Sequence, residues 1–200
     1  TVNQGDVEKA FKEADAVVEA TLDFARHTGV TLESRGIVAD WNKAENKMTI
    51  YHNGQAPHMM QHIIAKHLDL NEGLVRIVSR DVGGSFGIKV HVYPDEMAVT
   101  AISKKIGRPV KFIADRLESF TTDIHARCHK ISGKLGVDKN GKILAMEIDD
   151  LSGIGPFSMY PRTSAIETNQ VLNLSGAPYV IPNYKAVGTV VFQNCLLYTS

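Results

Sequence analysis

The sequence predicts an α+β fold, in which a mixed sheet with antiparallel hairpins packs against two main helices. The first hairpin pairs residues 36–41 with residues 47–52, and a polar segment between them supplies the turn. The second pairs residues 129–137 with residues 142–150 across the turn sequence Asp-Lys-Asn-Gly. Polar and apolar residues alternate along residues 129–137, which is typical of a strand with one buried face.

Two segments carry apolar residues at helical spacing and form the predicted helices. Residues 57–68 begin with a proline and place their apolar side chains on one face. Residues 94–106 also begin with a proline, have acids in the first turn and lysines in the last, and are followed by Gly107 as a stop signal. The second helix separates strand-like segments at 74–79 and 108–115, an order that suggests a βαβ-like unit.

The first 36 residues are predicted to contain a short helix, a strand and an irregular loop. Residues 5–14 form the helix, with Asp6 as its N-cap, and residues 15–24 have strand character. Residues 27–36 are broken by glycines at both ends. Three polar side chains of this loop are expected to be solvated and to carry no chemistry: His27, Glu33 and Arg35.

Composition limits the classes of function. The 200 residues are 44% apolar, which suffices for an ordinary domain with a real core. The formal net charge is zero. The sequence has no basic stripe of the kind that binds nucleic acid and no polybasic segment of the kind that binds a membrane surface. No apolar run approaches the roughly 18 residues of a membrane span. Two distant cysteines, Cys128 and Cys195, favour a reducing compartment, and we expect a cytoplasmic protein.

Residues 81–89 (DVGGSFGIK) connect the strand-like segment at 74–79 to the second helix. Three glycines within five positions allow positive φ angles and can bring successive N–H groups to one side, where they bind anions or oxo groups. Phe86 either packs into the core beneath the loop or forms a wall over whatever the amides hold. The phosphate-binding patterns of ATP, GTP and NAD sites are absent, so these nucleotides are poor candidates.

Other candidate residues have simpler structural explanations. His58 and His62 have the spacing of a helical metal pair, but Met59 replaces the glutamate of H-E-x-x-H, so solvated histidines are the better interpretation. Glu96 is explained by compensation of the helix dipole. Residues 116–120 are predicted to be a solvated turn with one ion pair, and residues 152–162 an aromatic loop.

The glycine loop resembles the D-V-G-G-G-F-G-x-K loop of the molybdenum hydroxylases, the family of xanthine dehydrogenase, aldehyde oxidase and aerobic carbon monoxide dehydrogenase. Further motifs match in the same order between residues 5 and 194, which makes the resemblance more specific than the loop alone. They are RHTG at 26–29, LESRG at 32–36, GQAP at 54–57, GRPVK at 107–111, DRLESF at 115–120 and YPR at 160–162.

This resemblance implies that the fold is the first part of a molybdenum cofactor-binding domain. Gln55 matches a glutamine that hydrogen-bonds an oxo ligand of molybdenum, and its amide can donate without adding charge to the site. The other implied cofactor contacts are the backbone amides of the loop, at Gly84, Ser85, Phe86 and Gly87. The implied cofactor is a molybdenum–pterin, expected as molybdopterin cytosine dinucleotide, with no protein side chain bound directly to the metal.

The family hydroxylates an electron-poor carbon of an N-heterocycle or aldehyde, or oxidises carbon monoxide, with water as the oxygen source. The resemblance implies that electrons leave through iron–sulfur clusters and FAD on partner subunits or domains, in a dimer of heterotrimers. Val90 stands where purine-oxidising members have a glutamate that holds the purine, which argues against purines. The family's general-base glutamate lies beyond residue 200, so no catalytic residue is expected within this chain.

Three segments are expected along the chain. Residues 1–26 match the tail of a preceding domain and the crossing between domains, and residues 27–194 match the N-terminal part of the cofactor-binding domain. Residues 195–200 replace the family's arginine–glycine loop and are predicted to be a truncated or non-family end, so the chain is expected to be an inactive fragment. The alternative is a non-catalytic α+β domain, a degenerate relative that acts only as an interaction surface.

Overall fold

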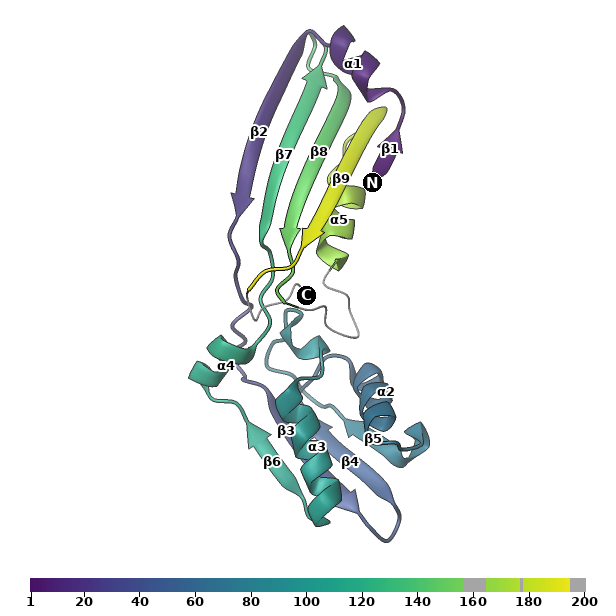
Figure 1. Cartoon of the computed structure of the whole chain (residues 1–200), viewed down its shortest axis with the longest axis vertical. Coiled ribbons are helices and arrows are strands. Elements are labelled where there is room, and N and C mark those ends of the chain that lie inside the picture. Colours follow the sequence, from purple (N-terminus) through teal and green to yellow (C-terminus); the bar gives the residue numbers. More distant parts are fainter. Residues whose placement is uncertain (157–164, 177, 195–200) are drawn as a thin grey trace. The chain divides into compact units, whose positions relative to one another are not determined.

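The structure is a computed structural model that describes residues 1–156, 165–176 and 178–194. The chain forms two compact units (Figure 1). One unit contains residues 1–27 together with the described residues from 125 onward, and the other contains residues 28–124. The predicted domain boundaries after residues 26 and 194 stay a prediction.

The first unit is built on a five-stranded mixed sheet with strand order β1-β9-β8-β7-β2. Neighbouring strands are antiparallel except for β8 and β9, which are parallel. The predicted hairpin of β7 and β8 is confirmed, and Gly141 in its turn has a φ of 80°. The strands are β1 (Val2–Gln4), β2 (Ala16–Phe24), β7 (His129–Val137), β8 (Ile143–Gly153) and β9 (Asn183–Val191).

Two helices pack on this sheet. Helix α1 (Val7–Glu13) begins after Asp6, whose Oδ1 accepts a hydrogen bond from the Lys9 N–H at 3.0 Å, as the N-cap prediction requires. Helix α5 (Ile166–Leu174) lies along β8 and β9 (Figure 1). It was not predicted from the sequence. Its Leu172 packs in a small core with Ile148, Tyr184 and Ala186.

The second unit has a four-stranded mixed sheet with strand order β5-β4-β3-β6. Strand β3 is antiparallel to both of its neighbours, whereas β4 and β5 are parallel. The predicted hairpin of β3 and β4 is therefore confirmed, as is the predicted α+β class. The strands are β3 (Gly36–Asn42), β4 (Lys47–His52), β5 (Val75–Val78) and β6 (Val110–Ile113).

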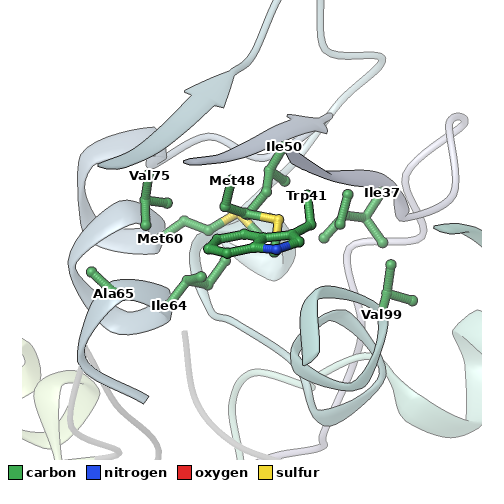
Figure 2. Close-up of a cluster of buried hydrophobic side chains, with 10 residues drawn as sticks. Ile37, Trp41, Met48, Ile50, Met60, Ile64, Ala65, Val75 and Val99 are labelled. Carbon is green, nitrogen blue, oxygen red and sulfur yellow. The ribbon is translucent and has the colours of Figure 1, made fainter. Parts of the chain in front are cut away.

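Helices α2 (Pro57–His67) and α3 (Pro94–Ile106) are the two predicted main helices, and both pack on one face of this sheet. Trp41 lies in the middle of the core between residues of the two helices (Figure 2). Period-two burial along β3 and β4 and helical spacing on α2 bring the apolar side chains together. The core comprises Ile37, Ala39, Trp41, Met48, Ile50, Met60, Ile64, Ala65, Val75 and Val99.

The connection between strands differs from the predicted βαβ-like unit around α3. Strands β5 and β6, which precede and follow α3, lie at opposite edges of the sheet because the β3–β4 hairpin separates them. The parallel neighbours joined by a helix are instead β4 and β5, with α2 between them in the chain. Only residues 53–56, which include Gln55, thus separate β4 from helix α2.

The predicted solvated turn at residues 116–120 is wrong. These residues lie in helix α4 (Arg116–Thr122). Asp115 and Glu118 form a capping box, in which Asp115 Oδ1 accepts the Glu118 N–H and Glu118 Oε2 accepts the Asp115 N–H, each at 2.8 Å. Reciprocal capping of two otherwise unpaired N–H groups stabilises such a short helix. The predicted ion pair within this segment is not among its described contacts.

No helix in the described part of the chain is long and apolar enough to cross a membrane.

Candidate cofactor-binding site

The glycine loop between β5 and α3 has an unusual backbone. Gly84, Phe86 and Gly87 have φ angles of 96°, 51° and 89°, and the loop ends in a 3₁₀ turn, η2 (Ile88–Val90). A positive φ is strained for a bulky residue such as phenylalanine, and strain of this kind gathers at functional sites. The Phe86 side chain is 75% exposed in this chain, so it does not pack into the core beneath the loop.

Gln55 lies against this loop, although 30 and 32 positions separate it in sequence from its partners Ser85 and Gly87. Its Oε1 accepts a hydrogen bond from the Gly87 N–H at 3.2 Å. The Ser85 hydroxyl donates to the same Oε1 atom. Two donors on the oxygen define which end of the carboxamide faces the loop, and they leave the Nε2 group directed elsewhere. Gln55 and the loop residues predicted with it are therefore brought together.

Several donors at this place have no acceptor within the described residues. They are the Gln55 Nε2 group and the backbone N–H groups of Gly84, Ser85 and Phe86. All of these donors are uncharged. Because they come from one loop and one side chain hydrogen-bonded to it, they form a local group of donors suited to an oxo or carbonyl-rich ligand.

The segment before Gln55 is fixed by several hydrogen bonds. The Asn53 side chain accepts the Gly36 N–H at 2.9 Å and donates to the Ser34 carbonyl at 2.8 Å. The Gly54 carbonyl accepts the Ser79 hydroxyl at 2.7 Å. The Gln55 N–H donates to the Lys89 carbonyl at 3.1 Å. The end of β4 is thus joined to β3, to the residue after β5 and to the glycine loop.

Glu33 contacts the glycine loop directly, contrary to the prediction of a solvated side chain without a role. Its Oε2 lies 2.8 Å from both the Gly83 nitrogen and the Lys89 Nζ. Partial burial raises the pKa of Glu33, but the Lys89 and Gly83 hydrogen bonds outweigh this and hold its pKa below the ordinary value. The signal available in the sequence was Lys89 itself, a lysine set among apolar residues at the end of the loop.

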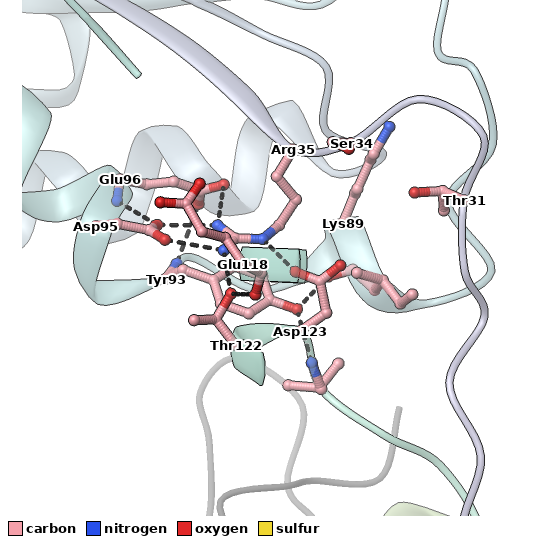
Figure 3. A network of polar contacts seen from close by, with 12 residues as sticks. Thr31, Ser34, Arg35, Lys89, Tyr93, Asp95, Glu96, Glu118, Thr122 and Asp123 are labelled. Atoms are coloured by element: carbon pink, nitrogen blue, oxygen red, sulfur yellow. Dashed lines mark hydrogen bonds and ion pairs between the residues drawn. The ribbon is translucent and has the colours of Figure 1, made fainter. Parts of the chain in front are cut away.

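Arg35 was also predicted to be solvated, and this prediction is wrong. Its side chain is 1% exposed and lies 3.7 Å above the centre of the Tyr93 ring. The guanidinium makes two hydrogen bonds to Asp95, at 2.9 and 2.8 Å, and contacts Glu96 at 3.3 Å and Asp123 at 2.7 Å (Figure 3). A buried guanidinium requires such partners because its N–H groups cannot donate hydrogen bonds to water. Burial by itself would lower the pKa of Arg35. The neighbouring acids together outweigh this effect and raise the pKa above its ordinary value, so the group stays charged.

This acidic network supports both sides of the candidate site. Glu96 caps α3 by accepting the Tyr93 N–H at 3.0 Å, and it also lies 3.0 Å from His52 Nε2 at the end of β4. The Tyr93 hydroxyl donates to the Ile88 carbonyl at the end of the glycine loop, at 2.8 Å. Burial raises the pKa of Tyr93, and burial likewise raises that of Asp123 although Arg35 partly offsets it. Glu96 therefore does more than compensate the helix dipole.

The remaining sequence candidates lie elsewhere. His62 Nδ1 is 2.6 Å from Glu72 Oε1 in an exposed pair, and His58 is exposed. Among the described residues, no group of three or more histidine, cysteine or acidic side chains could hold a metal ion. Val90 is buried. Cys195 and the motif at 160–162 lie outside the described residues.

Comparison with known proteins decides the family. All 200 residues match the molybdopterin cofactor-binding domain. The chain belongs to this family. It is 32% identical over 163 residues to the nicotine 6-hydroxylase large subunit of Paenarthrobacter nicotinovorans, covering 82% of this chain and 20% of the relative. It is 34% identical over 147 residues to the carbon monoxide dehydrogenase large chain of Hydrogenophaga pseudoflava, covering 74% of this chain and 18% of that one.

Solved structures agree with the family. The domain superposes on quinoline 2-oxidoreductase from Pseudomonas putida 86 with a TM-score of 0.89 and 27% identity, over 98% of this chain and 25% of that one. It matches carbon monoxide dehydrogenase from Oligotropha carboxidovorans with a TM-score of 0.87 and 26% identity, over 100% of this chain and 25% of the other. The domain thus spans about a fifth to a quarter of the length of these relatives.

The donor group at Gln55 and the glycine loop fits a molybdenum–pterin cofactor. Oxo ligands of the metal and the carbonyl groups of a pterin are hydrogen-bond acceptors, and the free donors of the site are uncharged amides. Gly84 has a φ of 96°, which strains any L side chain, and a Cβ added there would lie 3.1 Å from the Phe86 ring, so glycine is required for this loop conformation.

Proposed function

We propose that Gln55 and the backbone amides of Gly84, Ser85, Phe86 and Gly87 form part of the cofactor site of a molybdenum-dependent oxidoreductase. The observation that carries the proposal is the double hydrogen bond on Gln55 Oε1, from Ser85 and from Gly87. This arrangement holds the carboxamide in one orientation and leaves its NH₂ group available to a ligand. The Gly87 N–H is used to orient Gln55, and the other three loop amides are left for the cofactor.

The bound cofactor would supply the oxidation of a substrate carbon with water as the oxygen source. The residues of this chain would bind and orient it. Gln55 Nε2 would donate to an oxo group, and the amides of the loop would donate to neighbouring acceptors, without changing the net charge of the site. Donors fixed before the ligand arrives lose little entropy on binding, which favours preorganised sites.

An N-heterocycle, an aldehyde or carbon monoxide is the proposed class of substrate. Relatives whose names include nicotine, quinoline and carbon monoxide support this range. The uncharged Val90 supports the exclusion of purines. The proposed cofactor form is molybdopterin cytosine dinucleotide, and the proposed partners are an iron–sulfur subunit and an FAD subunit in a dimer of heterotrimers. A cytoplasmic location is proposed from the cysteine content.

Metal analysis of the protein that carries this chain, produced in a host that makes molybdenum cofactor, tests the proposal. We expect molybdenum and pterin in the purified protein, and oxidation of at least one substrate class with an artificial electron acceptor. The variant Gln55→Leu should lose about 10- to 100-fold in cofactor occupancy or turnover, as is typical when a supporting hydrogen bond at a metal site is removed.

A matched control is Gln170→Leu, because Gln170 is an exposed glutamine on α5 in the other unit. It should retain the cofactor content of the parent protein. A well-folded protein that contains neither molybdenum nor pterin would contradict the proposal and favour the non-catalytic domain. Equal effects of the two glutamine substitutions would remove Gln55 from the site.

A further inference from the structure

One carboxylate oxygen joins the two ends of the glycine loop. Glu33 Oε2 accepts the Gly83 N–H near the beginning of the loop and contacts the Lys89 ammonium at its end, both at 2.8 Å. The contact with Gly83 is reciprocal, because the Glu33 N–H donates to the Gly83 carbonyl at 3.2 Å. The loop residues that present free amides, 84–86, lie between these two attachment points.

The ion pair is asymmetric in its burial. The Lys89 side chain is 0% exposed, whereas that of Glu33 is 41% exposed. A buried ammonium is costly unless it is paired. Within the described residues, the Lys89 ammonium has no hydrogen-bond acceptor other than Glu33. Lys89 therefore depends on Glu33 to remain in its buried position.

The backbone of Lys89 is connected to Gln55 in two ways. Its carbonyl accepts the Gln55 N–H at 3.1 Å. Its N–H donates to Ser85 Oγ at 3.2 Å, and the Ser85 hydroxyl donates to Gln55 Oε1. A displacement of Lys89 would thus move both the main chain and the carboxamide of Gln55. These links connect Glu33 to the donor group without any direct contact between Glu33 and Gln55.

We propose that Glu33 and Lys89 are positioning residues, whose ion pair holds the glycine loop and Gln55 in the conformation that binds the cofactor. This inference rests on the proposed function of the site. Glu33 and Lys89 do not contact the cofactor in this proposal. They act on it only through the glycine loop and Gln55, whose positions they fix. In this account Glu33 supplies the acceptor that sets the beginning of the loop, and Lys89 sets its end.

Gly83 offers an independent way to disturb the same contact. A Cβ atom added at Gly83 would lie 2.5 Å from the Glu33 Cβ, which is too close for either residue to remain in place. The φ angle of Gly83 is not in the left-handed region, so alanine is compatible with the backbone. The substitution Gly83→Ala should therefore displace Glu33 while leaving both members of the ion pair in the sequence.

Hydrogen exchange followed by mass spectrometry tests the positioning role without requiring cofactor. The protein that carries this chain is compared with Glu33→Ala, Glu33→Gln, Lys89→Met and Gly83→Ala. The matched control is Glu45→Ala, which removes an exposed partner of Lys47 at 3.2 Å. We expect exchange of the hydrogen-bonded amides of the loop, at Gly83, Gly87, Ile88 and Lys89, to rise about fivefold or more in Glu33→Ala, Lys89→Met and Gly83→Ala, the effect of losing a hydrogen bond. Strands β3 and β4 serve as the internal reference and should stay protected.

Cofactor content is measured on the same samples. The three variants should contain about 10- to 100-fold less molybdenum and pterin than the parent. Glu33→Gln keeps an acceptor for Gly83 but loses the charge, so its occupancy should be intermediate. Glu45→Ala should match the parent in both measurements.

The outcomes separate this inference from the proposed function. A parent protein without cofactor would contradict the proposed function, whereas selective loosening of residues 81–89 would still support the positioning role. Loop exchange in Glu33→Ala equal to that in Glu45→Ala would overturn the inference. Equal loss of protection in the loop and in β3 and β4 would also overturn it, since the ion pair would then serve general stability.

Discussion

Gln55 and Gly87 are joined by a hydrogen bond of 3.2 Å from the Gly87 N–H to the Gln55 side-chain oxygen. This contact links the segment after β4 to the glycine loop after β5. Because β4 and β5 are parallel neighbours, they finish at the same end of the sheet, and the segments that follow them begin side by side. The sheet topology therefore explains why a glutamine and a glycine loop far apart in sequence lie together.

Ser85 makes a specific contribution to this contact that can be tested. Its hydroxyl donates to Gln55 Oε1 and accepts the Lys89 N–H. Ser85→Gly should weaken the orientation of Gln55 but leave the Gly87 hydrogen bond, so we expect cofactor occupancy to fall about fivefold, the equivalent of one neutral hydrogen bond of about 1 kcal/mol. Molybdenum content per protein measures this. Unchanged content would mean that Gly87 alone orients Gln55.

Arg35 should be among the most important side chains for the stability of the second unit. Replacing it by methionine leaves buried acids without their cation, and we expect the free energy of unfolding to fall by about 3–5 kcal/mol. Arg35→Lys should restore only part of this, because a point charge cannot make the two parallel hydrogen bonds to Asp95. Urea denaturation measures the effect. Arg76→Met, at an exposed position of β5, is the control and should change stability by less than about 0.5 kcal/mol.

His129 should make the first unit less stable as the pH rises. Its Nε2 lies 3.3 Å from Glu167 and its Nδ1 lies 2.9 Å from Asp150. The Glu167 hydrogen bond raises the pKa of His129 above its ordinary value of 6.5, burial opposes this, and Asp150 adds to the increase. A raised pKa in the folded state gives stability that is fully present below the unfolded pKa and is lost as pH rises through the folded pKa.

Thermal unfolding measured above and below pH 6.5 checks this prediction. The melting temperature of the parent should fall with increasing pH relative to that of His129→Gln, in which the titrating group is gone. His67→Gln, at the exposed last residue of α2, should follow the parent. Parallel curves for the parent and His129→Gln would show that the histidine is not charged in the folded state.

Ile64 tests the core beneath the candidate site. Its side chain is 0% exposed and packs in the cluster around Trp41. Ile64→Ala should lower the free energy of unfolding by about 2–5 kcal/mol through lost burial and the cavity that remains. Ile102→Ala, at a position 45% exposed on α3, should cost much less. Chemical denaturation of both variants decides between this core and a different packing of α2.

Local sequence signals predicted most of the fold. Proline at the start of α3 and Gly107 at its end marked the helix, and Gly107 has the expected left-handed φ of 67°. Asp115 and Glu118 form the capping box of α4, although the segment that contains Glu118 is predicted to be a turn. Topology was harder, because the pairing of β4 with β5 depends on which strands the chain brings together, and no single segment encodes it.

The candidate site was predictable only in part. Gln55 and the glycine loop were identified through their resemblance to a family, and physical reasoning then explained their donors. Glu33 and Arg35 could not be recognised from their neighbours, because their partners lie at distant positions such as Lys89 and Asp123. A charged residue in a glycine-flanked loop is expected to be solvated until the fold brings opposite charges to it.

A crystal structure of the cofactor-loaded protein is the most direct test of the account. In that crystal structure we expect Gln55 Nε2 to lie within about 3.2 Å of an oxygen atom bound to molybdenum, while Oε1 still accepts the Gly87 N–H. A separation beyond about 3.6 Å, with the carboxamide and the amides of Gly84, Ser85 and Phe86 turned away from the cofactor, would contradict it.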